Sequence, residues 1–353
     1  MSTGGPTAIS SADKRPGQLM ASEMAEQPGR IAALMSRRSE LEKEVRSLAP
    51  AGLAGTVLVA RGSSDHAAKC GAYLLEMATG RPVALASPSI LTLYRSATDY
   101  SGYLLIAVSQ SGQTPEIVEV VQLARANGAR AIAITNDPLS PLASAADLVV
   151  ALEAGAERAV PATKTVTAQL VAFTIIAQAL GEVGLDERVA GELPGQVAQV
   201  LADPAPVTGL AGWLRGADRL VTVARGILYG AAQEAALKVE ETTSLLTAAF
   251  SAADLRHGPI AIASMAPPVL AFAHPGPASK DVVEVVAELR ARGANVRLAG
   301  PVEGSDLAWP ASAQEVVAPV LAVVRGQQLA LSLALELGRD PDAPPGLMKV
   351  TAT

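Results

Sequence analysis

The chain has 353 residues, of which 50% are hydrophobic but only 3% aromatic, and its formal net charge is −6 with a pI near 5.3. The length predicts two domains, and the acidic balance argues against nucleic acid or an anionic membrane as a partner. No signal peptide is visible, and Gln or Arg side chains interrupt the long apolar runs, so we expect a cytoplasmic protein without a membrane span.

Two segments precede the first domain. Residues 1–18 are rich in Gly, Ser, Pro and Ala and lack periodicity, which predicts a disordered N-terminus. Residues 19–50 are expected to form a helical lead segment. Its charged stretch Arg37–Arg46 is interpreted as a solvated helix face.

The first domain, residues 51–185, alternates short apolar strands with amphipathic helices. This α/β pattern predicts a mostly parallel sheet with helices on both faces. The expected strands are Thr56–Ala60, Pro82–Ala86, Leu104–Val108, Ala131–Thr135 and Leu148–Leu152. The expected helices are His66–Thr79, Pro115–Asn127 and Lys164–Leu180. Cys70, the only cysteine, falls in the first helix and is interpreted as a small buried hydrophobe.

The loop 109–114, Ser-Gln-Ser-Gly-Gln-Thr, connects a buried strand to a helix. Pro115 suits the first helical position and Thr114 can cap the helix. Hydroxyls, a side-chain amide and backbone N–H groups at a helix N-terminus bind phosphate without a basic side chain. The candidate phosphate ligands are Ser109, Gln110, Ser111 and Thr114. An ordinary polar turn could have the same composition.

An internal duplication relates this domain to a second one, residues 210–339, which follows a Pro- and Gly-rich connection, Pro194–Gly216. Leu104–Val108 aligns with Val269–Ala273 at an offset of 165 residues. In the second copy His274–Ser279 replaces the loop 109–114, and its two prolines remove backbone donors. The duplication therefore predicts one anion site for the two domains, at the carboxyl ends of the strands of the first sheet.

Charged residues share one face of a helix expected early in the second domain. Glu234, Lys238 and Glu241 are spaced i, i+4 and i+7, whereas Glu240 points away. His257 follows, just before a Gly-Pro turn. A carboxylate, an ammonium group and an imidazole near a bound phosphate could transfer protons. The spacing fits equally well a solvent-facing ion pair and a loop histidine without a function.

Together these motifs resemble the sugar isomerase (SIS) domain family. Both halves look like SIS domains, whose fold is doubly wound and flavodoxin-like, and residues 20–353 are similar to the isomerase half of glucosamine-6-phosphate synthase. The residues that carry the resemblance are the loop 109–114, Ala162-Thr163-Lys164, Glu234–Glu241, Arg256–Pro259 and Leu347–Thr351 in the tail 340–353.

The resemblance implies which residues bind the substrate. The loop 109–114 would hold the phosphate of a sugar phosphate, and Ser63 and Ser64 would contact the sugar. Ala162 departs from the family, which has a serine there, so one sugar contact is in doubt.

The resemblance also implies catalytic roles. Glu241 would move a proton between C1 and C2 of the open-chain sugar. His257 would open the sugar ring from the neighbouring subunit, which implies a homodimer. Lys349 would reach the carbonyl carbon as an imine partner or a charge stabiliser, and Lys238 and Glu234 would set the protonation of Glu241.

The family's synthases carry a glutaminase domain, whereas only about 50 residues precede the first SIS domain here. The resemblance therefore implies an SIS-type glucosamine-6-phosphate deaminase, which produces fructose 6-phosphate and ammonia. No metal or other cofactor is expected, since no His, Cys or Asp cluster has metal-ligand spacing. A fructosamine-phosphate deglycase, another amino-sugar-phosphate deaminase or isomerase, and a non-catalytic sugar-phosphate sensor remain alternatives.

Overall fold

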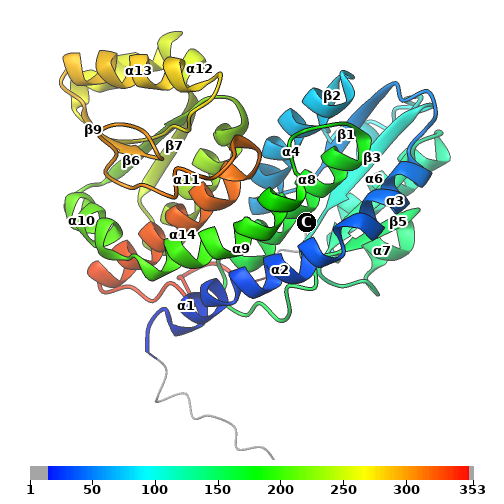
Figure 1. Ribbon diagram of the computed structural model, residues 1–353, viewed down its shortest axis with the longest axis horizontal. Coiled ribbons are helices and arrows are strands. Elements are labelled where there is room, and N and C mark those ends of the chain that lie inside the picture. The colour runs from blue at the N-terminus through cyan, green and yellow to red at the C-terminus, as the bar shows by residue number, and fades with distance from the viewer. Residues whose placement is uncertain (1–14, 350–353) are drawn as a thin grey trace, which may run out of the picture.

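Two parallel sheets lie on either side of a central layer of helices in the computed structural model of the protein (Figure 1). The structure describes residues 15–349. The predicted disorder of residues 1–18 therefore falls almost wholly outside the described residues, and helix α1 begins at Gln18. The α/β fold class predicted from the sequence is confirmed.

The first sheet has the strand order β2-β1-β3-β4-β5, and every pair in it is parallel. Its strands are β1 Gly55–Val59, β2 Val83–Leu85, β3 Tyr103–Val108, β4 Arg130–Thr135 and β5 Leu148–Ala151. Its helices are α4 Ser63–Thr79, α5 Ser89–Thr92, α6 Pro115–Ala126, α7 Pro141–Ala145 and α8 Lys164–Leu180. The predicted strands and helices are all confirmed, and the largest shift of a boundary is at α4, which begins three residues before His66.

The second sheet has the order β7-β6-β8-β9 and is also parallel. Its strands are β6 Arg219–Ala224, β7 Leu246–Ser251, β8 Pro268–Phe272 and β9 Asn295–Ala299. Its helices are η2 Gly226–Leu228, α11 Tyr229–Thr243, α12 Ala252–Arg256, η3 Pro259–Met265, α13 Ser279–Ala291, η4 Glu315–Val317 and α14 Ala318–Glu336. Val57 lies opposite Leu105 in the first sheet, and Thr222 lies opposite Leu270 in the second. The duplicated sequence thus folds twice with the corresponding strands paired in parallel, β1 with β3 and β6 with β8.

Helices α4, α8, α11 and α14 fill the space between the sheets and share one hydrophobic core (Figure 1). The halves approach each other closely at Gly230, where an added Cβ would lie 2.4 Å from the carbonyl oxygen of His66 and 2.6 Å from Cys70 Sγ. Only a residue without a side chain lets α4 and α11 come this close. Cys70 is buried as predicted, and burial raises the pKa of its thiol to about 12.

The connection predicted at Pro194–Gly216 is wrong. Helix α9, Glu187–Ala202, runs through Pro194, and α10, Ala205–Leu214, follows it. Proline disfavours a helix interior because it lacks an N–H group. Here the buried stripe of α9 outweighs that loss, since Val189, Leu193, Val197 and Val200 all pack inside the protein.

The lead segment is helical, as predicted, and forms α1 Gln18–Ala25, α2 Gln27–Ser36 and α3 Arg38–Leu48. The stretch Arg37–Arg46 is not wholly solvated, which corrects that prediction. Arg38 is 9% exposed, donates to the carbonyl oxygens of Leu185 and Asp186, and pairs with a carboxylate at the start of α9.

One helical stretch in the described part, 315–336, is long and apolar enough to cross a membrane. Inside the protein, however, 89% of its apolar window is buried, which is typical of a core helix. Arg325 within it donates to the carbonyl oxygens of Ala308 at 2.8 Å and Asp203 at 2.7 Å. The polar residues that interrupt this apolar run therefore have protein partners.

Candidate active site

A cleft of about 380 Å³ opens at the carboxyl ends of β1 and β3. Most of the residues predicted to bind or convert a substrate line this cleft. They are Ser63, Ser64, Ser109, Gln110, Ser111, Thr114, Glu241 and Lys349. Segments far apart in the sequence, from both domains and the tail, thus meet at one place. Ala162, where the family has a serine, also lines the cleft.

The loop 109–114 has the shape of an anion site. Gly112 has a φ of 64°, and an added Cβ would lie 2.1 Å from Ser140 Oγ, so glycine is required there. Within residues 15–349 the amides of Gln110 and Ser111 donate to no protein group. Those N–H groups and the N-terminus of α6 remain available to an anion.

Thr114 occupies the N-cap position of α6, but its hydroxyl makes no capping bond. It lies instead 3.3 Å from Ser109 Oγ. The helix-cap prediction for its side chain is therefore wrong, because the hydroxyl turns toward the loop. This orientation leaves both hydroxyls at the wall of the cleft.

A second wall of the cleft is formed by the segment that follows β1. It begins at Gly62, which has a φ of 56°. Ser63 and Ser64 then open α4. Ser64 Oγ accepts a 3.0 Å hydrogen bond from Gln169 Nε2, which fixes its side chain. Arg61, also at the cleft, pairs with Glu116 in the first turn of α6.

A buried array of charged side chains on α11 reaches the cleft at Glu241. Lys238 Nζ lies 3.5 Å from Glu234 Oε1 and also binds the carboxylate of Glu241. Glu234 and Lys238 are each 1% exposed, whereas Glu241 is 23% exposed. A solvent-facing ion pair is therefore excluded. Glu240, as predicted, points away from the array and is exposed.

His66 of α4 extends the array across the domain boundary. Its Nδ1 lies 2.9 Å from Glu234 Oε2, one helical turn beyond the Gly230 contact. The order His66, Glu234, Lys238, Glu241 is a continuous path of hydrogen bonds and ion pairs. Protonation at one group in such a low-dielectric path changes the charge that the next group experiences.

Burial raises the pKa of Glu241, with a further contribution from the charge of Glu234, and these effects outweigh the opposing pull of Lys238. Burial alone would raise the pKa of Glu234, but Lys238 and the hydrogen bond from His66 lower it overall. Burial opposes the charge of Lys238 as well, yet Glu234 and Glu241 raise the pKa of its ammonium group. The array thus keeps a charged Glu234–Lys238 pair beside a carboxyl group that takes up a proton readily.

Lys349 reaches the cleft from the C-terminal tail, and its Nζ lies 2.9 Å from Glu157 Oε2. The side chain of Glu157 is fully buried and accepts hydrogen bonds from the amides of Thr163, at 2.9 Å, and Thr165, at 3.1 Å. Burial opposes the charge of Glu157, but Lys349 and these hydrogen bonds lower its pKa overall. The anchored carboxylate gives the tail lysine a fixed partner.

The tail is also tied to the lead segment. Asp342 accepts hydrogen bonds from the amides of Leu19 and Met20, both at 2.8 Å, at the N-terminus of α1. Lys164 of the motif Ala162-Thr163-Lys164 does not line the cleft and binds Glu26 at 2.9 Å. That lysine therefore fixes the lead segment to α8.

His257 does not line this cleft. It is exposed and follows the last residue of α12, in the second domain. Among the predicted catalytic residues, Glu234 and Lys238 lie behind Glu241 in the buried array, and His257 is the one that the chain does not bring to the array or the cleft.

Sequence reasoning missed His66 and Glu157. Both lie next to motifs that were recognised: His66 follows Ser63 and Ser64, and Glu157 precedes Thr163 and Lys164. The segment around Glu157 also contains Glu153 and Arg158, so nothing in its composition singled out Glu157. His66 offered no signal either, because its partner lies 168 residues away in the other domain.

The family model described as SIS domain matches residues 56–179 and 213–300. The chain belongs to the SIS domain family. This confirms the resemblance inferred from its motifs.

Relatives and solved structures agree with this assignment. A glutamine–fructose-6-phosphate aminotransferase (isomerizing) of Symbiobacterium thermophilum is 32% identical over an alignment of 355 residues. The alignment covers 94% of this chain and 58% of the relative. The SIS chain thus spans little more than half the length of that relative. A solved structure from Silicibacter pomeroyi DSS-3, provisionally assigned as a phosphosugar isomerase, is 31% identical with a TM-score of 0.84 and covers 92% of this chain and 99% of its own.

A glucosamine-6-phosphate deaminase from Thermotoga maritima has the same fold. Its TM-score is 0.78 at 22% identity, over 95% of this chain and all of the other.

Proposed function

We propose that this SIS protein is an enzyme that acts on phosphorylated amino sugars, and that it converts glucosamine 6-phosphate and water to fructose 6-phosphate and ammonia. The observation that carries the proposal is the meeting of three chemistries in one cleft. The loop 109–114 supplies anion-binding groups, Glu241 supplies a carboxylate, and Lys349 supplies an ammonium group.

In this reaction the phosphate binds at the loop 109–114 and the open-chain sugar extends toward Glu241. The Glu241 carboxylate removes the proton from C2, the C–H electron pair forms the C1–C2 double bond, and the π pair of the C1 carbonyl moves to its oxygen, which takes up a proton to give an enolamine. Return of the C2 proton to C1 and loss of a proton from nitrogen leave an imine at C2. Water adds to that carbon, the C–N bond breaks, and ammonia leaves as the ketone forms.

The electrostatics of the array support Glu241 as the proton carrier. A group that both takes and returns a proton works best when its pKa lies near the operating pH. Burial raises the pKa of Glu241 in that direction, while Lys238 holds the carboxylate in position. Lys349, which also lines the cleft, can stabilise negative charge that develops on the sugar oxygen at C1.

We propose further that the protein works as a homodimer in which His257 of one subunit completes the partner's cleft and opens the sugar ring. His257 is exposed and outside the cleft of its own chain, so a second copy would have to supply it.

The names of the curated relatives support this substrate class, since those proteins transfer an amino group to fructose 6-phosphate. The solved structure at 31% identity carries a phosphosugar assignment. These likenesses support a phosphorylated sugar as the substrate, and the choice of deaminase among the reactions of this class is what the following test decides.

The test is release of ammonia and formation of fructose 6-phosphate from millimolar glucosamine 6-phosphate by the full chain. A panel of galactosamine 6-phosphate, a phosphorylated fructosamine and fructose 6-phosphate separates the alternative reactions. Turnover of the fructosamine alone would favour a deglycase. Absence of turnover with every compound would contradict an enzyme of this kind.

Ser111→Ala should raise KM for glucosamine 6-phosphate about tenfold with a smaller effect on kcat, because it removes a contact that the substrate makes before and during the reaction. Ser264→Ala is the matched control, since Ser264 is an exposed serine of η3 outside the cleft. An unchanged KM in Ser111→Ala would count against phosphate binding at the loop.

A further inference from the structure

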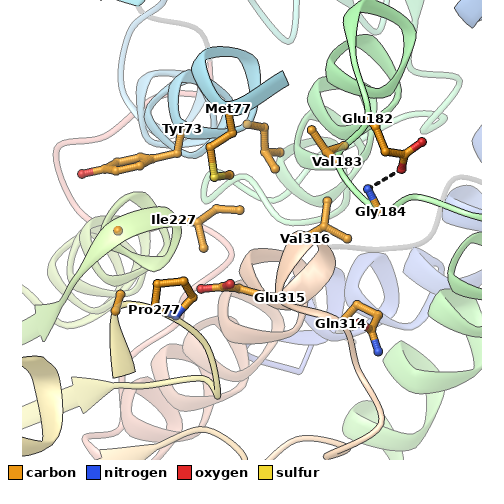
Figure 2. A pocket seen from close by; sticks show the side chains of 13 residues that line it. Tyr73, Met77, Glu182, Val183, Gly184, Ile227, Pro277, Gln314, Glu315 and Val316 are labelled. Carbon is orange, nitrogen blue, oxygen red and sulfur yellow. Dashed lines mark hydrogen bonds between the residues drawn. The ribbon is translucent and has the colours of Figure 1, made fainter. Parts of the chain in front are cut away.

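The second sheet has its own cavity at the position that corresponds to the active-site cleft. In the second sheet α11, after β6, packs into the core between the sheets, whereas α13, after β8, packs into a separate core; α4 and α6, after β1 and β3, do the same in the first sheet. Ligands of such sheets bind at the point where these helices part, beyond the carboxyl ends of the strands. A cavity of about 500 Å³ opens there, between the second domain and α4 of the first (Figure 2).

The chemistry of this cavity is the reverse of that in the cleft. The duplication aligns Ile227 with Ser63, Pro277 with Gly112, and Ala278 with Gln113. Apolar or donor-free groups have thus replaced the polar wall and the anion loop. The opposite wall is apolar too and consists of Tyr73, Leu74 and Met77 of α4 together with Val183 and Val316.

A carboxylate stands in this apolar setting. Glu315, at the start of η4, extends between Pro277 and Ile227 (Figure 2). An added Cβ at Gly276 would lie 2.6 Å from its carboxylate oxygens, so the group rests against the loop that corresponds to the phosphate loop. Burial raises the pKa of Glu315. In the described part of the chain Glu315 forms no ion pair with Lys or Arg.

The titratable groups near Glu315 already have protein partners. Arg225 lies 3.4 Å from Asp281 and donates to Ser251. His274 Nδ1 accepts a 3.2 Å hydrogen bond from Trp309 Nε1, and burial lowers the pKa of His274, so it brings no positive charge. Glu182, at the edge of the cavity, adds a second carboxylate, which accepts hydrogen bonds from Gln178 and the amide of Gly184.

We propose that this interdomain cavity is a second ligand site, which binds a small organic cation with an apolar body. Its ammonium group would pair with Glu315, and its apolar part would lie against Met77, Ile227 and Val316. The cavity volume fits a small molecule, and the carboxylates select against the phosphate compounds that the first cleft takes. This inference does not depend on the proposed reaction.

The probe is 2-phenylethylammonium, titrated into the full chain that carries ¹³C-methyl methionine. We expect the methyl resonance of Met77, one of seven methionines, to move on binding, and its assignment follows from Met77→Leu. The isosteric anion 3-phenylpropionate should bind at least about tenfold more weakly, since charge pairs in a desolvated site dominate selectivity.

Glu315→Gln should weaken binding of the ammonium probe by about tenfold or more. Glu303→Gln is the matched control, because Glu303 is exposed and outside the cavity, and its affinity should stay within about twofold. Equal binding of the ammonium and carboxylate probes to the unaltered protein would overturn the proposal without any variant. So would a Met77 resonance that does not move, or full affinity in a folded Glu315→Gln protein.

Discussion

Glu241 is the partly exposed end of a charged array whose middle members, Glu234 and Lys238, are shut off from solvent. The carboxylates of Glu234 and Glu241 both contact Lys238, and Glu234 also contacts His66. Two carboxylates on one helix are thereby given different proton affinities, and the one with the higher pKa faces the cleft. The neighbours of each carboxylate, rather than its residue type, decide its role.

Glu241→Gln should lower kcat by about a thousandfold, because the amide cannot carry a proton between two carbons. Binding of glucosamine 6-phosphate should persist, since the loop 109–114 is untouched. Isothermal titration together with ammonia release separates these quantities. Glu240→Gln is the control on the exposed face of the same helix, and full activity in Glu241→Gln would remove this residue from the mechanism.

The pH dependence of the unaltered protein follows from the direction of the Glu241 pKa shift. Proton removal requires the carboxylate form, so kcat/KM should fall as the pH decreases through the pKa of Glu241. Because that pKa is raised, this fall should occur above 4.5, the ordinary glutamate value. A profile that stays flat down to pH 4.5 would contradict the assignment.

His66→Ala should reduce kcat about tenfold and shift the fall of kcat/KM to lower pH. Without His66 the carboxylate of Glu234 is protonated more easily, and the negative charge that helps to raise the pKa of Glu241 is weakened. His66→Gln can still donate to Glu234 and should restore the pH profile toward that of the unaltered protein. A loss of kcat with no shift in pH would mean that His66 only supports packing.

At the scale of elements, the active site depends on the separation of α4 and α11. His66 precedes Cys70 by one turn of α4, and Gly230 precedes Glu234 by one turn of α11. The missing side chain at Gly230 thus sets the distance that the His66–Glu234 hydrogen bond needs. The packing contact at Gly230 and the polar contact between His66 and Glu234 are therefore both made by the helix pair α4 and α11.

Gly230→Ala should destabilise the protein by about 1–3 kcal/mol, because its Cβ would meet backbone and sulfur atoms that cannot move aside. It should also reproduce part of the pH shift of His66→Ala by separating the two helices. Gly212→Ala in α10 is the control, since no atom lies within 4 Å of an added Cβ, and it should stabilise slightly. Thermal unfolding measures both, and equal stability of the two variants would disprove the close-contact argument.

At the scale of the whole molecule, the cleft draws on two domains and a tail, and the proposed homodimer would add His257 of a second subunit. When His257→Ala and Lys349→Ala proteins are mixed and allowed to exchange subunits, a mixed dimer has one site with both residues intact. Random pairing should therefore restore about a quarter of full activity. Each protein alone should be nearly inactive in ammonia release. If subunit exchange is verified and the mixture has only the summed activity of the two separate variants, His257 and Lys349 act in the same chain's site.

The two α/β domains, the strands and helices of the first and the loop 109–114 could be predicted because local patterns specify them. Short apolar strands, Pro115 at a helix start and a repeat at a constant offset need no knowledge of distant contacts. The same reasoning failed for α9, where burial of a whole helix face outweighs Pro194. It also failed for the charged stretch of the lead segment, because Arg38 finds its partners about 150 residues later in the chain.

Within the candidate site, the limit of prediction is again sequence distance. Helical spacing placed Glu234, Lys238 and Glu241 on one face, but it could not decide whether that face was wet or dry. The pairs His66–Glu234 and Lys349–Glu157 join residues 168 and 192 positions apart. Such contacts arise only when the two halves of the chain pack together.

Asp342 joins the last segment of the chain to the first helix, after the second domain is complete. The tail therefore packs against α1, the first helix of the described part of the chain. Cleavage of the chain between the two domains would place Lys349 and Glu157, and likewise Ser111 and Glu241, on different fragments. Neither fragment alone would therefore contain a complete cleft. Loss of the contacts between α1 and Asp342 should likewise free the tail that carries Lys349. Helix α1, which lies outside the cleft, would then affect turnover.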